Sequence, residues 1–275
     1  IFHSRHTAIE INQQVFEESF PRIVSCLEEP VAASSIVPMY FVSERARQSV
    51  TVALNGQGPD ELFGGYTRHL GVHYGGVWAS LPTWLRGPVA SGIRSLPRAE
   101  ALRRGLYSLD VQDRMRRYQQ VFSIASEEGI DGMFHHELLP AGTGDRILES
   151  WSDLVPLMEN TDELGGLQFI ELRSTLPDEL LMYADKLSMA HSLEVRVPYL
   201  DREVVEYVER LKATFKVRNG VRKWLHRSVC RSFLPARLLR RKKRGFAVNV
   251  VDEWFRNSRS PIVDEMFEDS SSIIY

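Results

Sequence analysis

The sequence predicts an α/β fold in which part of a parallel sheet is followed by a mostly helical region. A continuous, β-branched apolar run lies at residues 50–54, as is typical of a strand buried in a parallel sheet. Helical apolar patterns lie on both sides of this run, which indicates alternating helices and strands. Beyond residue 61 the helical patterns continue, while strand-like runs become rare.

The first part of the chain carries the elements of the predicted sheet region. Apolar residues recur at helical spacing over 12–28, and Pro30 is expected to end that helix. A second helix is expected over 36–48, with arginine and glutamate on its outer side. The run Val50–Leu54 then forms the buried strand.

The rest of the chain is expected to be helices joined by loops. Proline and glycine predict a loop-rich stretch over 82–97 and a second loop over 140–144. The amphipathic patterns that predict helices cover 61–80, 98–107, 113–127, 147–159, 163–191, 201–212 and 221–232.

Composition limits the classes of function. The formal net charge of −2 gives no overall electrostatic reason to bind nucleic acid or a membrane surface, and no apolar run approaches 18 residues. Cys26 and Cys230 make no disulfide framework and fit buried thiols in a reducing compartment. His69 and His73 share an i, i+4 spacing, but no third ligand follows at zinc spacing, so surface or packing roles are expected.

A glycine-rich turn follows the predicted strand. Residues 55–66 read NGQGPDELFGGY. Glycine lets the backbone turn sharply and approach a ligand closely, and Asp60 has the chemistry to hold Mg²⁺ on phosphates. The alternative is a plain strand-to-helix turn. Ligands of open α/β sheets bind at the carboxyl ends of strands, and this position favours a phosphate-bearing ligand.

Two later blocks extend this motif. Residues 185–201 read DKLSMAHSLEVRVPYLD, and residues 241–246 read RKKRGF. In this order the three blocks resemble the synthetase domain of glutamine-dependent asparagine synthetases. That family carries S-G-x-G-x-D-E-x-F-G-G-Y, then D-x-x-S-M-A-x-S-x-E-x-R-x-P-F-L-D, then R-x-K-x-G-F.

The resemblance implies an ATP pyrophosphatase-like fold. Residues 1–80 would then be the trailing part of an α/β nucleotide-binding domain, with 6–11 as the third strand of its sheet. Residues 81–275 would be the mostly helical part of the same synthetase domain. The family's N-terminal glutaminase domain and its S-G-G-x-D-S pyrophosphate loop are not in this sequence. We therefore interpret the chain as a fragment that is inactive alone.

The resemblance also implies a reaction and its setting. A cytoplasmic ligase would activate aspartate with ATP and Mg²⁺ to β-aspartyl-AMP, and glutamine-derived ammonia would then form asparagine. A homodimer is left open, and neither nucleic acid nor a membrane is expected as a partner. By resemblance the catalytic residues are Gln57, Lys243, Glu194 and Arg196, the ATP contacts are Asn55, Gly56, Gly58 and Asp185, and the metal ligand is Asp60.

Several of these residues have other interpretations. Gln57 stands where asparagine synthetases usually have glutamate, and an amide cannot take up a proton at neutral pH. That departure favours a relative that forms another amide, such as a β-lactam or a cyclised peptide. A truncated, non-catalytic binding module is the third hypothesis.

The later blocks have structural alternatives too. Glu194 and Arg196 are also consistent with a buried ion-pair network, and Lys243 with a solvated basic face. Pro198 most simply fixes a turn, and Asp201 most simply caps a helix that starts near Glu203. His191 lies inside the second block and is expected behind the residues that contact the ligand.

Overall fold

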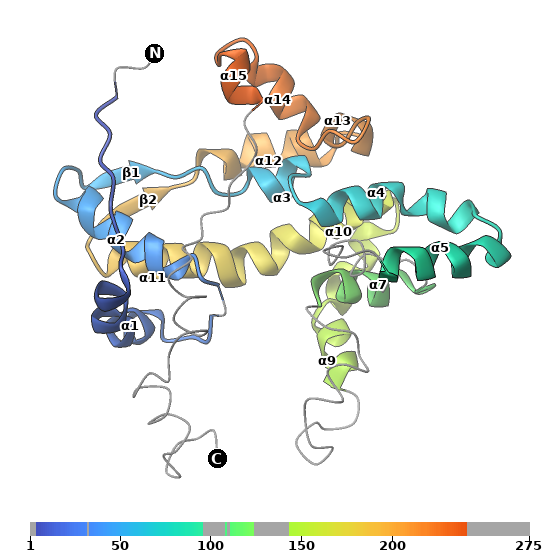
Figure 1. Ribbon diagram of the computed structural model, residues 1–275, viewed down its shortest axis with the longest axis horizontal. Coiled ribbons are helices and arrows are strands. Elements are labelled where there is room, and N and C mark those ends of the chain that lie inside the picture. Colours follow the sequence, from blue (N-terminus) through green and yellow to red (C-terminus); the bar gives the residue numbers. More distant parts are fainter. Residues whose placement is uncertain (1–3, 32, 96–107, 109–110, 124–142, 241–275) are drawn as a thin grey trace. The chain divides into compact units, whose positions relative to one another are not determined.

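The computed structural model describes residues 4–31, 33–95, 108, 111–123 and 143–240 (Figure 1). The described chain forms two compact units. The first contains the residues up to Asn55 together with Asp178–Pro198, and the second contains Gly56–Pro177 and Tyr199–Arg240. Each unit therefore combines stretches that are distant in sequence. The boundary expected near residue 80 stays a prediction.

The first unit holds three helices and both strands of a small sheet. Its elements are α1 (Gln13–Leu27), α2 (Ile36–Arg47), β1 (Val52–Leu54), α11 (Met182–Met189) and β2 (Glu194–Arg196). Helix α11 packs against α1 and α2 (Figure 1). The fully buried side chains of this core include Phe16, Ile23 and Leu187. The helices predicted over 12–28 and 36–48 are confirmed.

Both ends of helix α1 are determined by residues next to them in sequence. The Asn12 side chain accepts a hydrogen bond from the backbone N–H of Val15 at 2.9 Å, which satisfies one of the free donors of the first turn. Glu28 follows the helix in the left-handed conformation, so the chain already turns away before Pro30. The helix ends as expected, but at a left-handed cap rather than at the proline.

The two strands pair in parallel, with Val52 opposite Glu194 and Leu54 opposite Arg196. The parallel strand at the predicted position is confirmed. The expectation of burial is wrong, because Val52 is 40% and Leu54 74% exposed within the described part of the chain. The strand expected at 6–11 is also wrong, because residues 4–12 have no regular structure and most of their side chains are exposed.

The second unit is helical, as predicted for the region beyond residue 61. Its α-helices are α3 (Pro59–Phe63), α4 (Thr67–Ser80), α5 (Thr83–Ser95), α7 (Arg114–Phe122), α9 (Thr143–Ser150), α10 (Glu163–Arg173), α12 (Arg202–Glu209), α13 (Ala213–Lys216), α14 (Trp224–Cys230) and α15 (Ala236–Leu239). Shorter turns of this unit are the 3₁₀ elements η1 (Ser152–Leu154) and η2 (Pro156–Met158). Two more turns span the division between the units in sequence: the π-helical turn η3 (Leu176–Leu181) and the 3₁₀ turn η4 (Pro198–Leu200).

Helix α10 lies at the centre of this unit and packs against α3, α4 and η2. Leu167 and Ile170 of α10 are fully buried in one core with Tyr118 of α7. Among the described helices, none is long and apolar enough to cross a membrane.

Three sequence expectations differ from the structure of this unit or lie outside it. The loop-rich stretch expected over 82–97 is largely helix α5, with Pro88 inside it. The helix expected over 61–80 is broken at Gly64, whose φ of 75° ends α3. The helix expected over 98–107 lies outside the described residues.

Candidate functional site

The glycine-rich loop leaves the sheet at Asn55, in the first unit. The backbone N–H of Asn55 donates to the carbonyl of Arg196 at 2.8 Å and so extends the parallel ladder by one step. The loop therefore begins at the carboxyl end of β1, where ligands of parallel sheets bind. This position is the one expected from the sequence, and the contact of Asn55 with ATP stays a prediction.

In the second unit the loop turns into helix α3 at Gly58. Gly58 has a φ of 95°, which is the left-handed region that other residues rarely adopt. A β-carbon at this position would also collide with the Leu200 side chain. Gly56 is different, because a β-carbon there would meet no atom within 4 Å. Glycine is thus required at 58, while the backbone at 56 is open to approach by a ligand.

Asp60 lies in the first turn of α3 and pairs with a lysine from a distant part of the chain. Its Oδ1 atom is 3.0 Å from Nζ of Lys223, and the two side chains are only 20% and 19% exposed. A β-carbon at Gly65 would collide with both side chains, so glycine at 65 makes room for the pair. Lys223 itself has a φ of 52°, at the N-terminus of α14.

His226 lies one turn beyond Lys223 on α14. The Tyr199 hydroxyl and His226 Nε2 are 3.0 Å apart, and the Phe63 and Tyr199 rings pack near the imidazole. Burial lowers the pKa of His226, the Lys223 charge lowers it further, and Asp60 opposes them. The imidazole is therefore neutral at neutral pH, which leaves Lys223 as the cation beside Asp60.

Helix α3 is held in place by a buried amide on α10. Five residues are too few for a helix that is stable alone, so α3 depends on outside contacts. Gln168 Nε2 donates to the carbonyls of Glu61 and Leu62 at 2.5 and 3.1 Å. Lys216 Nζ in turn donates to Gln168 Oε1 at 3.1 Å, and both side chains are nearly fully buried. This chain of hydrogen bonds fixes the helix that carries Asp60.

A second buried group joins α4 to α10. Glu171, which is completely buried, accepts from Arg68 Nε at 2.6 Å and lies 2.7 Å from Nε2 of His69. His69 is fully buried, so the expected packing role is confirmed for it and the surface role is wrong. The Tyr66 hydroxyl donates to the buried carboxylate of Glu61, which ties the Gly64-Gly65 turn to α3.

Three charged residues of the second sequence block, Asp185, Glu194 and Arg196, are exposed within the described part of the chain. Arg196 Nε is 2.8 Å from Glu194 Oε1, and the two side chains are 65% and 54% exposed. They form an ion pair, but the buried network expected as the alternative is wrong. Asp185 is exposed on α11, and its backbone carbonyl accepts from the Ser188 hydroxyl. Their roles toward a ligand stay predictions.

Other residues of this block have settled places. Asp201 accepts from the backbone N–H of Glu203 at 3.0 Å, so the expected helix cap is confirmed. Pro198 begins the 3₁₀ turn η4, as expected of a turn residue. The His191 ring packs edge-on against Tyr40, with centroids 4.4 Å apart. Lys243 lies outside the described residues.

The donor set around Asp60 fits one kind of metal site. The described residues contain no group of three or more histidine, cysteine or carboxylate side chains that could hold a metal. Mg²⁺ needs only one or two protein carboxylates when phosphates and water supply its other ligands. Asp60 therefore fits a Mg²⁺ ion that arrives with a phosphate-bearing ligand.

The sequence motifs did not reveal Lys223, His226, Gln168 or Lys216. Lys223 pairs with Asp60, and His226 packs against Phe63. Gln168 and Lys216 hold α3 through hydrogen bonds. All four come from stretches of sequence that carry no recognisable motif. The only signal for Lys223 was its place before the helical pattern at 221–232, and that pattern alone does not point to Asp60.

Comparisons with known proteins agree with the geometry. The asparagine synthase family model matches residues 1–274. A putative glutamine-hydrolyzing asparagine synthetase of Mycobacterium bovis is 34% identical over 263 residues, which are 92% of this chain and 38% of that protein. Asparagine synthetase 1 of Bacillus subtilis is 27% identical over 273 residues, which are 96% of this chain and 41% of that protein.

The chain thus spans about two fifths of the length of these curated relatives. The family match covers nearly all 275 residues and includes all three sequence blocks. The chain belongs to the asparagine synthase family.

Proposed function

We propose that this chain forms the carboxylate-activating part of an ATP-dependent amide synthetase whose acceptor is aspartate. Family membership supports amide formation driven by ATP. The observation that carries the proposal is the Asp60–Lys223 pair in the loop-to-helix turn beyond β1. Two backbone features accommodate the pair: Gly65, where a β-carbon would collide with both side chains, and the left-handed conformation of Lys223.

The proposed chemistry has two steps. An oxygen of the aspartate side chain attacks the α-phosphorus of ATP, and the bond to the bridging oxygen breaks. β-Aspartyl-AMP and pyrophosphate result. Ammonia then attacks the acyl carbon, AMP leaves with the bonding electrons, and the nitrogen loses a proton to give asparagine.

The residues of this chain would act on charge and position. Asp60 would hold Mg²⁺, which neutralises phosphate charge when it is bound. The Lys223 ammonium, beside that carboxylate, is placed to stabilise negative phosphate oxygens. Asn55 and the open backbone at Gly56 would contact ATP, and the buried amide of Gln168 would keep α3 in register.

A matched pair of variants tests this proposal. Asp60→Asn removes the carboxylate charge at the candidate site, and Asp153→Asn removes one from an exposed side chain on η1. Pyrophosphate release is measured with ATP, aspartate, ammonia and Mg²⁺, on the protein in the full length that its gene encodes. We expect the Mg²⁺ concentration for half-maximal rate to rise at least about 10-fold for Asp60→Asn. An equal, small effect of both variants would refute the proposal.

Gln57 favours a second candidate, a relative that forms a different amide. A neutral amide at this position can orient ammonia by hydrogen bonding but cannot take up its proton. Mass spectrometry of the products separates the candidates. Asparagine from aspartate and ammonia supports the first, and AMP release with another carboxylate only supports the second.

A further inference from the structure

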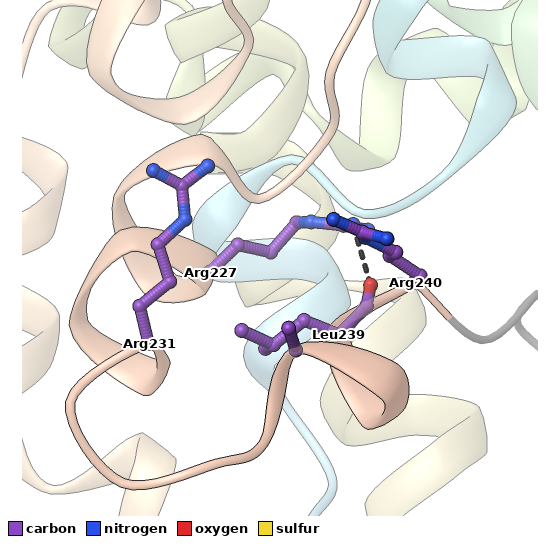
Figure 2. Close-up of a pocket in the computed structure, with 5 residues that line it drawn as sticks. Arg227, Arg231, Leu239 and Arg240 are labelled. Atoms are coloured by element: carbon purple, nitrogen blue, oxygen red, sulfur yellow. Dashed lines mark hydrogen bonds between the residues drawn. The ribbon is translucent and has the colours of Figure 1, made fainter.

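A pocket lined by arginine side chains lies on α14 and α15, in the second unit. Its volume is about 280 Å³, and its lining residues are Arg227, Arg231, Ala236, Leu239 and Arg240 (Figure 2). Asp60 and Lys223 are not among them. The pocket therefore excludes the two residues that carry the candidate site for ATP, although Arg227 follows Lys223 by one helical turn on α14.

One arginine holds the pocket together. Arg227 Nη2 donates to the backbone carbonyl of Leu239 at 2.7 Å, which ties α14 to the last residue of α15 (Figure 2). This contact uses only part of the guanidinium, which carries five N–H donors. The side chain thus sits at the pocket with donors left for a ligand.

The other two arginines have no acidic partner among the described residues. No ion pair or hydrogen bond joins the side chain of Arg231 or Arg240 to any described residue. The sequence also supplies no acidic residue close to them along the chain. Between Glu209 and Asp252 it contains fourteen lysine and arginine residues and no aspartate or glutamate, although the whole chain has a net charge of −2.

The three arginines are exposed, and no described carboxylate pairs with them. An anion in the pocket would meet uncompensated positive charge. Guanidinium is planar and offers paired donors that match phosphate oxygens, which makes arginine the usual residue for phosphate recognition. The volume lies just below the usual range for small-molecule sites, so it suits a compact ligand rather than a long polymer.

We propose that this pocket binds a small anion that carries two or more phosphate groups, free or at the end of a nucleotide. Arg231 and Arg240 supply charge and hydrogen bonds to the phosphate oxygens. Arg227 orients the pocket through Leu239 and adds the third positive group. The sequence from residue 210 to 251, which contains all three arginines, carries no aspartate or glutamate of its own.

The test measures binding of inorganic pyrophosphate to the intact protein by calorimetry, in EDTA so that no site that needs Mg²⁺ contributes. The double variant Arg231→Gln/Arg240→Gln removes two charges from the pocket. The matched control Arg5→Gln/Arg146→Gln removes two charges from exposed arginines elsewhere. Arg227 is left in place because its loss would free the carbonyl of Leu239.

We expect saturable binding that weakens at least about 10-fold in the pocket variant and less than about twofold in the control. Circular dichroism checks that both variants fold. Neither Arg231 nor Arg240 belongs to the candidate site for ATP, and that site is tested by pyrophosphate release with Mg²⁺ present, so the two proposals fail separately.

One further ligand, ADP, identifies the source of the phosphates. Tighter binding of ADP than of pyrophosphate assigns the pocket to a nucleotide, and equal affinity assigns it to free polyphosphate. Three results overturn the proposal. They are no saturable binding of pyrophosphate, an equal loss in both double variants, and binding of a single-stranded RNA oligonucleotide without binding of pyrophosphate.

Discussion

Replacing Gln168 with leucine should lower the free energy of unfolding of the second unit and disturb the candidate site. The amide donates to two carbonyls of α3 and accepts from the ammonium of Lys216, all in a buried setting. Leucine has a similar size, so the change removes hydrogen bonds more than volume. It leaves two carbonyls and one ammonium without a partner.

The magnitude follows from these three groups. An unsatisfied buried polar group costs about 1–3 kcal/mol, and a charged one costs more. Because neighbouring helices relax and water can enter, we expect a total loss of about 3–5 kcal/mol in the free energy of unfolding. That is a large part of the stability of an ordinary domain. Urea unfolding followed by circular dichroism measures it.

A double variant tests the reasoning rather than the size alone. Gln168→Leu leaves the ammonium of Lys216 without its hydrogen-bond acceptor, and Lys216→Met removes that ammonium. The double variant should therefore lose about 1 kcal/mol or more less stability than the sum of the two single losses. Additive losses, or a loss below about 1 kcal/mol for Gln168→Leu, would show that the chain of hydrogen bonds does not hold α3.

Three other predictions concern charge near the site. Lys243→Ala should lower AMP formation by about 10²–10³-fold while Lys242→Ala does little, and equal effects would mean that this basic run is only a solvated face. Gln57→Glu should keep or raise the ratio of asparagine to AMP if the protein makes asparagine, and should lower amide output if the pocket suits another amide; an unchanged ratio with unchanged rates would make Gln57 a turn residue. Burial lowers the pKa of Lys216 from 10.5, so between the lowered value and 10.5 the unfolded chain binds more protons than the folded one. The stability of wild type relative to Lys216→Met should therefore rise with pH across that alkaline window, and a flat or falling difference in urea unfolding would contradict it.

Local signals predicted those parts of the fold that depend on neighbouring residues. Asp201 caps its helix as the sequence indicated, and the β-branched run forms a parallel strand. Helix α5 was missed because Pro88 argues for a loop, whereas packing of Trp78 against Ala90 offsets the lost hydrogen bond. Tertiary contacts of this kind have no local signature.

The candidate site also has one part that local sequence predicted and one part that it did not. Motif spacing predicted the loop that carries Gly58 and Asp60, because the glycine and the carboxylate are adjacent in sequence. Asp60 pairs with Lys223, which belongs to the second of the two sequence stretches that form this unit. Only the folded chain brings these two side chains together, so no pattern in the sequence could have paired them.

The last prediction concerns the backbone of Lys223. The free-energy cost of its left-handed conformation is larger than the stability that its ion pair with Asp60 contributes. A residue with a β-carbon in the left-handed region costs about 1–2 kcal/mol, whereas an ion pair that is partly exposed contributes about 0–1 kcal/mol. Stability from the ion pair alone therefore does not account for lysine at this position, which is consistent with the proposed phosphate ligand. Lys223→Gly removes both the strain and the charge, so its free energy of unfolding should equal or exceed that of wild type, and should exceed that of Lys223→Ala by about 1 kcal/mol. Both variants should release pyrophosphate about 10²-fold more slowly. Full activity in Lys223→Gly would show that the pair serves the fold only, and the assignment of Lys223 to phosphate would then be wrong.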